Sequence, residues 1–182
     1  MAVFFILFLI FSILTPAGAE NVSALIEIPS GTSAKWELNK NSGLIEWEIK
    51  DGKKRIVNYL PYVCNYGMIP GTLLRKEDGG DGDPLDIIVL GPAMERGDTL
   101  GVRVIGIMHM IDGGETDDKI MSVSPSSVFR SVRSVNELRD EYPGVLEILK
   151  IWFANYKGRG QISVKGVSGP DIAAEMIRKA KF

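Results

Sequence analysis

The sequence predicts a β-rich α+β fold, a small barrel or sandwich of strands accompanied by two or three helices. Two observations support this class. Short alternating or apolar segments separated by glycine-rich turns occupy the chain as far as residue 123. Residues with helical spacing follow only after that point. The chain shows no internal repeat or linker, so residues 20–182 are expected to form one domain with its own core.

The first residues are predicted to be a targeting segment and not part of the fold. Residues 3–15 are apolar and uncharged, and Pro16 and an Ala-Gly-Ala sequence ending at Ala19 follow them. This pattern is typical of a secretory signal peptide, which we expect over residues 1–19. Because no Lys or Arg precedes the apolar run, an uncleaved membrane anchor is the alternative, although the run is shorter than the roughly 20 residues that span a bilayer. Cleavage predicts a periplasmic or secreted protein with no stable membrane insertion.

Alternation predicts a β-hairpin near the start of the domain. Residues 35–39 and 45–49 alternate between polar and apolar, with a turn around Gly43 between them. One face of the hairpin is therefore apolar, and Lys35 and Glu37 point to the other side. Further strands are expected over residues 25–28, 87–90, 102–110 and 120–123.

Helical signals appear in the last third of the chain. Ser134 and Glu137 fit a capping box at the start of one helix. A second helix is expected after Pro143, with an apolar stripe at Val145, Ile148, Leu149, Trp152, Phe153 and Tyr156. A third is expected over residues 170–181, beginning near Pro170 and with its apolar face at Ala173, Met176, Ile177 and Ala180.

Charge and metal-ligand content argue against several classes of site. The formal net charge is −2, so the chain lacks the basic footprint of a nucleic-acid-binding domain. Cys64 is the only cysteine, which rules out a disulfide within the chain and leaves a buried free thiol as the expected state. His109 is the only histidine, so no zinc site is expected and a structural or surface position is predicted for it.

An acidic turn directly ahead of an apolar strand is the strongest sign of function. Residues 77–86 contain five carboxylates, and the apolar residues 87–90 follow. At an effective dielectric constant near 20, two carboxylates about 4 Å apart repel by roughly 4 kcal/mol. A surface loop would spread these charges in water, but a strand that starts at Asp86 holds some of them together. Hard divalent cations such as Mg²⁺, Mn²⁺ or Ca²⁺ suit oxygen donors, so metal binding is the favoured interpretation.

A second acidic loop, residues 112–119, lies between two predicted strands. Alone it indicates a polar hairpin turn, but beside the first loop it suggests a site for several cations. Cationic and phenolic side chains elsewhere suggest an anionic ligand that metal ions and ammonium groups share, such as a phosphate. These side chains are Lys35, Lys53, Lys54, Arg55, Tyr62, Tyr66, Lys119, Tyr156 and Lys157.

The run Asp81-Gly82-Asp83-Pro84-Leu85-Asp86 resembles the signature of family I soluble inorganic pyrophosphatases. Other segments of the chain resemble further motifs of that family in the same order. They are residues 26–29, 35–37, 62–67, 112 with 117–119, and 156–157. The resemblance covers roughly Ala24 to the C-terminus. It implies an OB-like five-stranded closed barrel with two or three flanking helices, and an inorganic diphosphatase that hydrolyses diphosphate to two phosphates.

The resemblance also implies several Mg²⁺ ions per active site, for which Mn²⁺ or other divalent ions are possible substitutes. The implied metal ligands are Asp81, Asp86, Asp112, Asp117, Glu37 and Glu27. Asp81, Asp86 and Asp117 bind the first ion, and Asp86 is shared with the second. Asp112 and Asp117 hold an ion that arrives with the substrate, and Glu37, joined by Glu27, serves another.

The implied reaction is attack of a metal-activated water on phosphorus, without a covalent intermediate. Asp83 takes the role of general base, orienting the water and accepting its proton. The implied phosphate contacts are Lys35, Arg55, Tyr66, Lys119, Tyr156 and Lys157, with Tyr62 close by.

The chain departs from the family pattern at two places. The spacing between residues 53–55 and Tyr66 is one residue short of the bacterial pattern, which makes Lys54 an alternative to Arg55. Residues 158–161 form a shorter segment than the family's usual Lys-rich loop. The family is ordinarily cytoplasmic, which is the alternative location, and it forms homo-oligomers, commonly hexamers in bacteria.

A secreted calcium-binding module is the alternative from another class. Residues 79–83 are similar to the glycine-aspartate repeat of calcium β-helices, but that architecture requires stacked copies and this chain has one. An EF-hand loop starting at Asp78, Asp81 or Asp83 lacks the bidentate Glu that closes such a loop. A degenerate family member retained for binding is a third alternative, against which the full set of acidic residues argues.

Overall fold

The computed structural model describes residues 21–182 except residues 40, 76, 78, 79 and 81. The expected signal peptide, residues 1–19, therefore lies outside the described residues. So does the candidate metal ligand Asp81.

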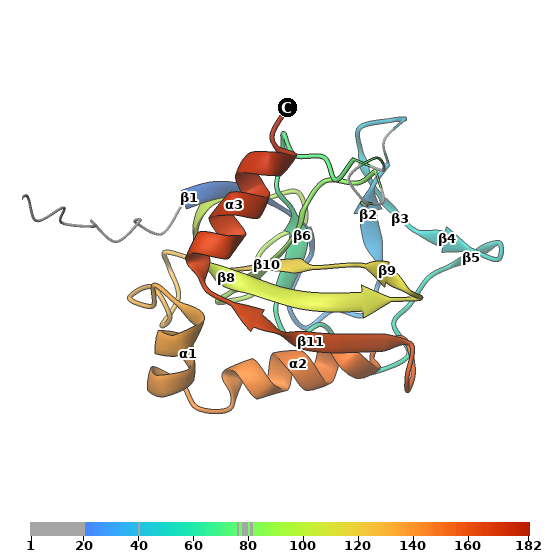
Figure 1. Ribbon diagram of the computed structural model, residues 1–182. Coiled ribbons are helices and arrows are strands. Elements are labelled where there is room, and N and C mark those ends of the chain that lie inside the picture. Colours follow the sequence, from blue (N-terminus) through green and yellow to red (C-terminus); the bar gives the residue numbers. More distant parts are fainter. Residues whose placement is uncertain (1–20, 40, 76, 78–79, 81) are drawn as a thin grey trace, which may run out of the picture.

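Five strands pair into a closed ring (Figure 1). Its members in spatial order are β1 (Asn21–Ile28), β6 (Asn65–Met68), β7 (Asp86–Leu90), β10 (Lys119–Val123) and β8 (Thr99–Asp112), and β8 pairs with β1 to close the ring. All pairs are antiparallel except β7 with β10, which run parallel. This ring confirms the predicted OB-like five-stranded barrel.

Two further strands extend the sheet from the long strand β8. β9 (Glu115–Thr116) lies in the second acidic loop and pairs with the last two residues of β8, Ile111 and Asp112. β11 (Ile162–Ser168) pairs with residues 107–112 of β8. The predicted strands over residues 25–28, 87–90, 102–110 and 120–123 are each found, and each is longer than predicted. β6 and β11 were not predicted, because β6 shows no alternating pattern and the alternation of β11 covers only residues 162–165 before Gly166 interrupts it.

The predicted hairpin consists of β2 (Trp36–Leu38) and β3 (Ile45–Trp47). Trp36 faces Trp47 across it, with the ring centroids 5.1 Å apart. The second arm ends two residues earlier than the predicted residue 49, because Ile49 begins a new strand. That strand, β4 (Ile49–Lys50), pairs with β5 (Lys53–Lys54) in a short hairpin that projects from the molecule in Figure 1.

Three helices flank the barrel, as predicted: α1 (Val135–Glu141), α2 (Val145–Asn155) and α3 (Pro170–Ala180). The Ser134 side chain accepts the Glu137 N–H at 3.1 Å, while Glu137 accepts the N–H of Arg133, so the capping pair forms with its return bond shifted by one residue. Among the described residues, no helix has the length and apolar character needed to cross a membrane.

The helices cover two separate apolar clusters that the barrel strands share. α2 packs on β11, and α3 packs on β8. Along β7, Ile88 and Leu90 belong to the cluster of α2, whereas Ile87 and Val89 belong to the cluster of α3. A strand buried on both faces explains why this segment reads as a continuous apolar run.

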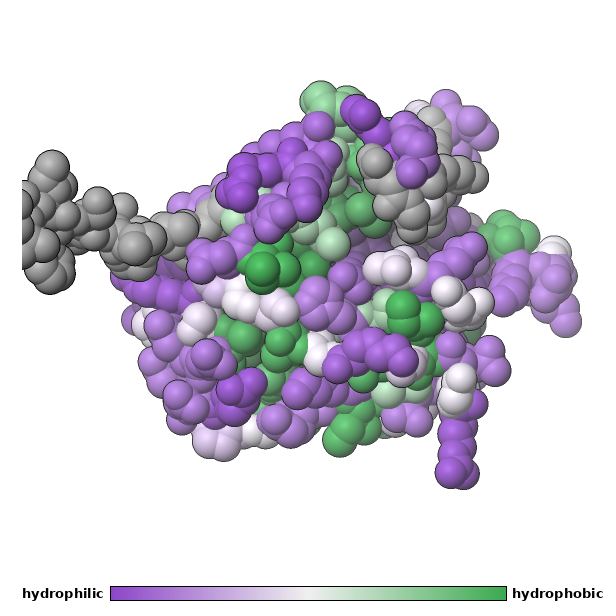
Figure 2. All heavy atoms as spheres, viewed as in Figure 1, coloured by the Kyte–Doolittle hydropathy of each residue, from purple (hydrophilic) through white to green (hydrophobic). Residues whose placement is uncertain are grey.

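The predicted apolar stripe of α2 is correct except at one position. Ile148 is 56% exposed, and Leu146 is buried in its place. The buried face therefore lies slightly further around the helix axis than predicted. The face predicted for α3 is buried at Ala173, Ile177 and Ala180. Hydrophilic residues cover most of the face seen in Figure 2.

Candidate active site

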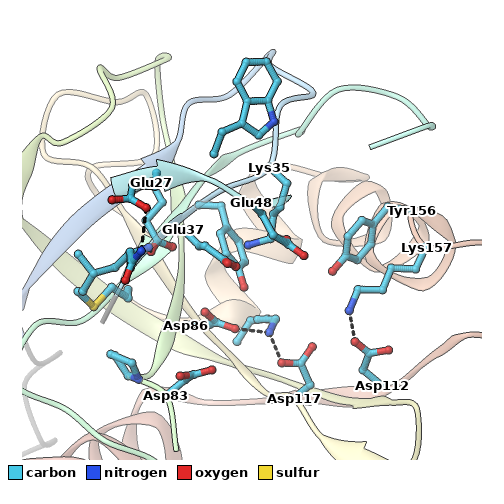
Figure 3. Close-up of a pocket in the computed structure, with 18 of the residues that line it drawn as sticks. Glu27, Lys35, Glu37, Glu48, Asp83, Asp86, Asp112, Asp117, Tyr156 and Lys157 are labelled. Atoms are coloured by element: carbon cyan, nitrogen blue, oxygen red, sulfur yellow. Dashed lines mark hydrogen bonds and ion pairs between the residues drawn. The ribbon is translucent and has the colours of Figure 1, made fainter. Parts of the chain in front are cut away.

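One cavity of about 780 Å³ collects most of the predicted site residues from distant parts of the chain (Figure 3). Its walls come from β1, the β2–β3 hairpin, β6, the start of β7, the acidic loop after β8 and the end of α2. The predicted residues that line it are Glu27, Lys35, Glu37, Tyr66, Asp83, Asp86, Asp112, Asp117, Lys119, Tyr156 and Lys157. Arg55 and Tyr62 lie beside it, and Asp81 is outside the described residues.

A buried lysine joins the two acidic segments. Asp86 begins β7 and Lys119 begins β10, and the parallel register of these strands sets the two residues side by side. The Lys119 Nζ lies 2.5 Å from a carboxylate oxygen of Asp86 and 2.5 Å from one of Asp117. Lys119 is only 1% exposed. A buried ammonium of this kind is tolerable only when it is paired.

Burial and neighbouring charges shift the pKa values of these residues in opposite directions. Burial alone lowers the pKa of Lys119, but Asp86 and Asp117 outweigh it and raise the pKa, so the ammonium stays charged. Burial raises the pKa of Asp117 more than the Lys119 ammonium lowers it. Two carboxylates around one ammonium leave an excess of negative charge at this point.

The end of α2 supplies the opposite wall. Lys157 forms an ion pair with Asp112. Tyr156 precedes it and stacks on Trp152, with the ring centroids 4.7 Å apart and the planes inclined by 7°. Trp152 in turn donates its indole N–H to the Leu60 carbonyl at 3.0 Å. The helix end is thereby fixed, and its tyrosine and lysine reach the cavity from a rigid element.

Tyr66 lines the cavity, and Tyr62 packs behind it. The ring of Tyr66 lies between two ammonium groups, with the Lys35 Nζ 5.5 Å and the Lys119 Nζ 5.8 Å from its centroid. Tyr62 is 2% exposed and packs behind Tyr66 and Tyr156. Burial raises the pKa of the Tyr66 and Tyr62 phenols above their ordinary value, so both stay neutral. The structure therefore places Tyr62 behind the cavity wall and not in it.

Glu27 enters the cavity from an irregular point in β1. The pairing of β1 with β6 shifts register between Ile26 and Ile28, and such a bulge redirects the side chain that it contains. One Glu27 carboxylate oxygen accepts the Leu38 N–H at 2.7 Å, which ties β1 to the β2–β3 hairpin. Burial raises the pKa of Glu27 to about 7.

Arg55 lies next to the cavity and is connected to it through a carboxylate. Its guanidinium Nη1 donates to both oxygens of Glu48, at 2.9 and 2.7 Å, and Glu48 lines the cavity. Lys54, the alternative to Arg55, instead places its Nζ 4.6 Å from the centroid of the Trp47 ring. Glu48 was missed in the sequence, although it occupies the same polar face as Glu46 in the predicted strand over residues 45–49.

The donor set fits hard divalent cations. Nine acidic side chains and three lysines are among the described residues that line the cavity, and carboxylate oxygens are hard donors. Within the described part of the chain, no three of the acidic side chains, Cys or His come close enough together to hold an ion unaided. Mg²⁺ characteristically binds one or two carboxylates and completes its shell with water and phosphate oxygens, which suits carboxylates spread around a cavity.

Comparison with known proteins agrees with this arrangement. The model of the inorganic pyrophosphatase family matches residues 24–181. The inorganic pyrophosphatase of Homo sapiens is 36% identical over 150 residues, which is 73% of this chain and 51% of that protein. The inorganic pyrophosphatase of Drosophila melanogaster is 36% identical over 148 residues, which is 73% of this chain and 44% of that protein. This chain thus spans about half the length of these relatives.

Solved structures show the same fold. The N-terminally truncated vacuolar soluble pyrophosphatase of Trypanosoma cruzi, in complex with PPi, has a TM-score of 0.83 and 25% identity, covering 97% of this chain and 73% of that one. The inorganic pyrophosphatase of Coxiella burnetii has a TM-score of 0.73 and 27% identity, covering 90% and 94%. The family model spans nearly the whole described domain, and the chain belongs to the inorganic pyrophosphatase family.

Proposed function

We propose that this chain is an inorganic diphosphatase that hydrolyses diphosphate to two phosphates in the presence of Mg²⁺. The observation that carries the proposal is the composition of one cavity. Carboxylates of four separate segments meet there with lysines and tyrosines that can bind phosphate oxygens. The relative from Trypanosoma cruzi, which holds PPi, and the family membership support the same substrate.

The metal ligands are proposed by position. Asp81, Asp86 and Asp117 would hold the first ion, with Asp86 shared by a second. Asp112 with Asp117 would hold an ion that arrives with diphosphate, and Glu37 with Glu27 another. When bound, Mg²⁺ would lower the pKa of a coordinated water and neutralise phosphate charge. Lys119 would meanwhile keep Asp86 and Asp117 aligned.

Asp83 is the proposed general base. It lines the cavity three residues before Asp86, and Pro84 between them restricts the backbone. Its carboxylate would orient the attacking water and accept a proton, while the bond from phosphorus to the bridging oxygen breaks. The proposed phosphate contacts are Lys35, Tyr66, Lys119, Tyr156 and Lys157, with Tyr62 supporting the aromatic wall. Arg55 would reach the phosphate by releasing Glu48.

The test is phosphate release from diphosphate by purified residues 20–182, with and without Mg²⁺. Asp83→Asn and Asp86→Asn are expected to lower turnover by about 10²-fold or more, because each removes a group that acts on the reacting atoms. Glu147→Gln, an exposed substitution on α2, is the matched control. Turnover by the unaltered protein no faster than by Asp83→Asn would overturn the proposal.

Assembly and location are further proposals from the sequence. We expect a homo-oligomer, with a hexamer as the form that the family resemblance suggests, and sedimentation velocity on residues 20–182 measures it. Export would remove residues 1–19 and leave a periplasmic or secreted enzyme. N-terminal sequencing of protein isolated from its host should then begin at Glu20, whereas an intact Met1 would contradict cleavage and favour the cytoplasmic or anchored alternative.

A further inference from the structure

The loop between β7 and β8 is fixed by hydrogen bonds to two barrel strands. Asn65 of β6 is fully buried, and its side-chain oxygen accepts the Met94 N–H at 3.0 Å. The Ile26 carbonyl of β1 accepts the Gly97 N–H at 2.8 Å. Arg96 lies between these two attachment points, so its backbone has a defined position relative to the barrel.

The guanidinium of Arg96 stacks on an indole ring of the β2–β3 hairpin. Its Cζ lies 3.5 Å from the centroid of the Trp36 ring, although Arg96 itself is exposed. Trp36 packs on Trp47, with the ring centroids 5.1 Å apart, and the Lys54 Nζ lies 4.6 Å from the centroid of the Trp47 ring. Each ring of the pair thus contacts one cation, which its electron-rich face attracts.

Trp36 is placed between two residues of the cavity. Side chains alternate along an extended chain, so Trp36 points to one side while Lys35 and Glu37, which line the cavity, point to the other. The Leu38 N–H, bonded to Glu27, is a further attachment of β2 to the barrel. Such attachments matter because β2 and β3 form a sheet of their own, and an isolated two-stranded hairpin is marginally stable at best.

We propose that Arg96 is a positioning residue, which by stacking on Trp36 holds the β2–β3 hairpin against the barrel and keeps Lys35 and Glu37 at the cavity. The inference rests on the proposed function, in which Lys35 contacts phosphate and Glu37 a metal ion. Arg96 is not among the described residues that line the cavity, so it acts through the Trp36 ring. Because Asp83 and the other acidic segments lie outside the hairpin, loss of Arg96 should weaken substrate binding and spare the chemical step.

Hydrogen exchange of the metal-free protein tests the contact without any turnover. Two amides report on opening of the hairpin: the Leu38 N–H, and the Glu48 N–H that donates to the Lys35 carbonyl at 3.0 Å. Their exchange, followed by NMR, should be about twofold to fivefold faster in Arg96→Ala. Arg178→Ala, an exposed change on α3, is the matched control and should leave both rates unaltered.

Steady-state kinetics in Mg²⁺ test the consequence for the site. Arg96→Ala should raise KM for diphosphate by about twofold to fivefold, with kcat changed by less than about twofold. Arg96→Lys should recover part of the loss, because an ammonium keeps the charge but not the planar stack. In a Trp36→Leu background, Arg96→Ala should have no further effect on KM, since the ring on which it acts is already gone.

Three results would overturn the inference. Equal amide exchange in Arg96→Ala and the control would show that the stack does not hold the hairpin. Faster exchange with an unchanged KM would show that the hairpin opens without disturbing the site. An equal effect of Arg96→Ala with and without the Trp36 ring would assign that effect to another contact. If the unaltered protein releases no phosphate, the proposed function fails, and the exchange rates still decide whether Arg96 holds the hairpin.

Discussion

Glu27 is a carboxyl group that the fold buries at the bulge of β1. Burial raises its pKa from an ordinary value of 4.5 to about 7, in spite of the nearby Lys35 ammonium and the Leu38 N–H. Between these two pH values, the folded protein keeps a proton on Glu27 that the unfolded chain releases. The unfolded chain therefore binds fewer protons, and the free energy of unfolding falls as the pH rises through this range.

This pH dependence is the first prediction. In metal-free protein, the Glu27 contribution should decrease by about 3 kcal/mol between about pH 4.5 and pH 7. Glu27→Gln should remove that part of the slope, because an amide does not titrate. Urea unfolding in EDTA across this range measures it, with Glu147→Gln as an exposed control. Identical slopes in the Glu27 variant and the unaltered protein would contradict the assignment.

His109 connects the acidic loop to the neighbouring strand. Its Nδ1 lies 2.8 Å from an Asp118 carboxylate oxygen and its Nε2 lies 2.8 Å from the Ser168 hydroxyl. The other Asp118 oxygen accepts the Met110 N–H at 2.9 Å. Asp118 stands between Asp117 and Lys119 in the chain, so this contact holds the part of the loop that carries the proposed metal ligand. His109 is thus a candidate positioning residue.

Replacing His109 tests this role. His109→Ala should raise the Mg²⁺ concentration for half-maximal activity by about threefold to tenfold, because the loop loses a support near a ligand. His109→Asn retains one short polar group and should recover part of the loss. Thermal unfolding of both variants controls for a change in fold. A Mg²⁺ dependence that is unchanged in His109→Ala would show that the contact supports the fold alone.

Most of the residues that line the cavity could be predicted from their types and spacing in the sequence. The positions of the others depend on how the elements pack. Asp86, Asp117 and Lys119 belong to motifs whose residue types and spacing already indicate their chemistry in the sequence. The sequence could not show that Tyr62 lies behind the wall, since that depends on how α2 packs on the barrel. Glu48 could not be predicted as a site residue, because its position at the cavity and its ion pair with Arg55 arise only in the folded hairpin.

At the scale of elements, β6 pairs with β1 through an unusually close approach of the two backbones. A Cβ built on Gly67 would lie 1.9 Å from the Leu25 carbonyl oxygen and 3.0 Å from the Ile26 Cα. Both neighbours are backbone atoms, which cannot move aside as a flexible side chain can. Glycine is therefore needed at this point for steric reasons, and the adjacent Tyr66 depends on the same pairing for its position.

Gly67→Ala is accordingly predicted to destabilise the fold by about 3 kcal/mol or more, because the added methyl group forces the two strands apart. Gly101→Ala in β8 is the matched control, since a Cβ there meets nothing within 4 Å. Its effect should stay within about 0.5 kcal/mol. Urea unfolding of both variants provides the measurement. Equal losses would mean that the loss of glycine, and not the contact with Leu25, determines stability.

The elements with a clear periodic pattern or a continuous apolar run are the ones that the sequence predicted. α3 places apolar residues at helical spacing, β7 and much of β8 are apolar runs, and each was expected close to its observed position. β6 reads Asn-Tyr-Gly-Met, which resembles a turn, and it becomes a strand only because β1 and β7 lie on either side of it. Tertiary pairing of this kind leaves no local pattern.

For the whole molecule, the barrel brings together charges that repel one another. Lys119 and Lys157 balance only part of the acidic lining of the cavity. Closure of the ring by β1 and β8 fixes the acidic segments despite this repulsion. Cations that bind only the folded cavity must therefore stabilise the entire domain.

Mg²⁺ should raise the midpoint of thermal unfolding of residues 20–182. At a Mg²⁺ concentration of about 100 times the dissociation constant, a single site contributes about 2.7 kcal/mol, which corresponds to roughly 5–10 °C for a domain of this size. NaCl at the same ionic strength screens the repulsion without filling a site, so it should produce a smaller shift. Asp117→Asn should reduce the Mg²⁺ shift, whereas Glu147→Gln should preserve it, because only the former loses a proposed ligand. Equal shifts with MgCl₂ and NaCl would indicate screening alone and would contradict a metal site in the cavity.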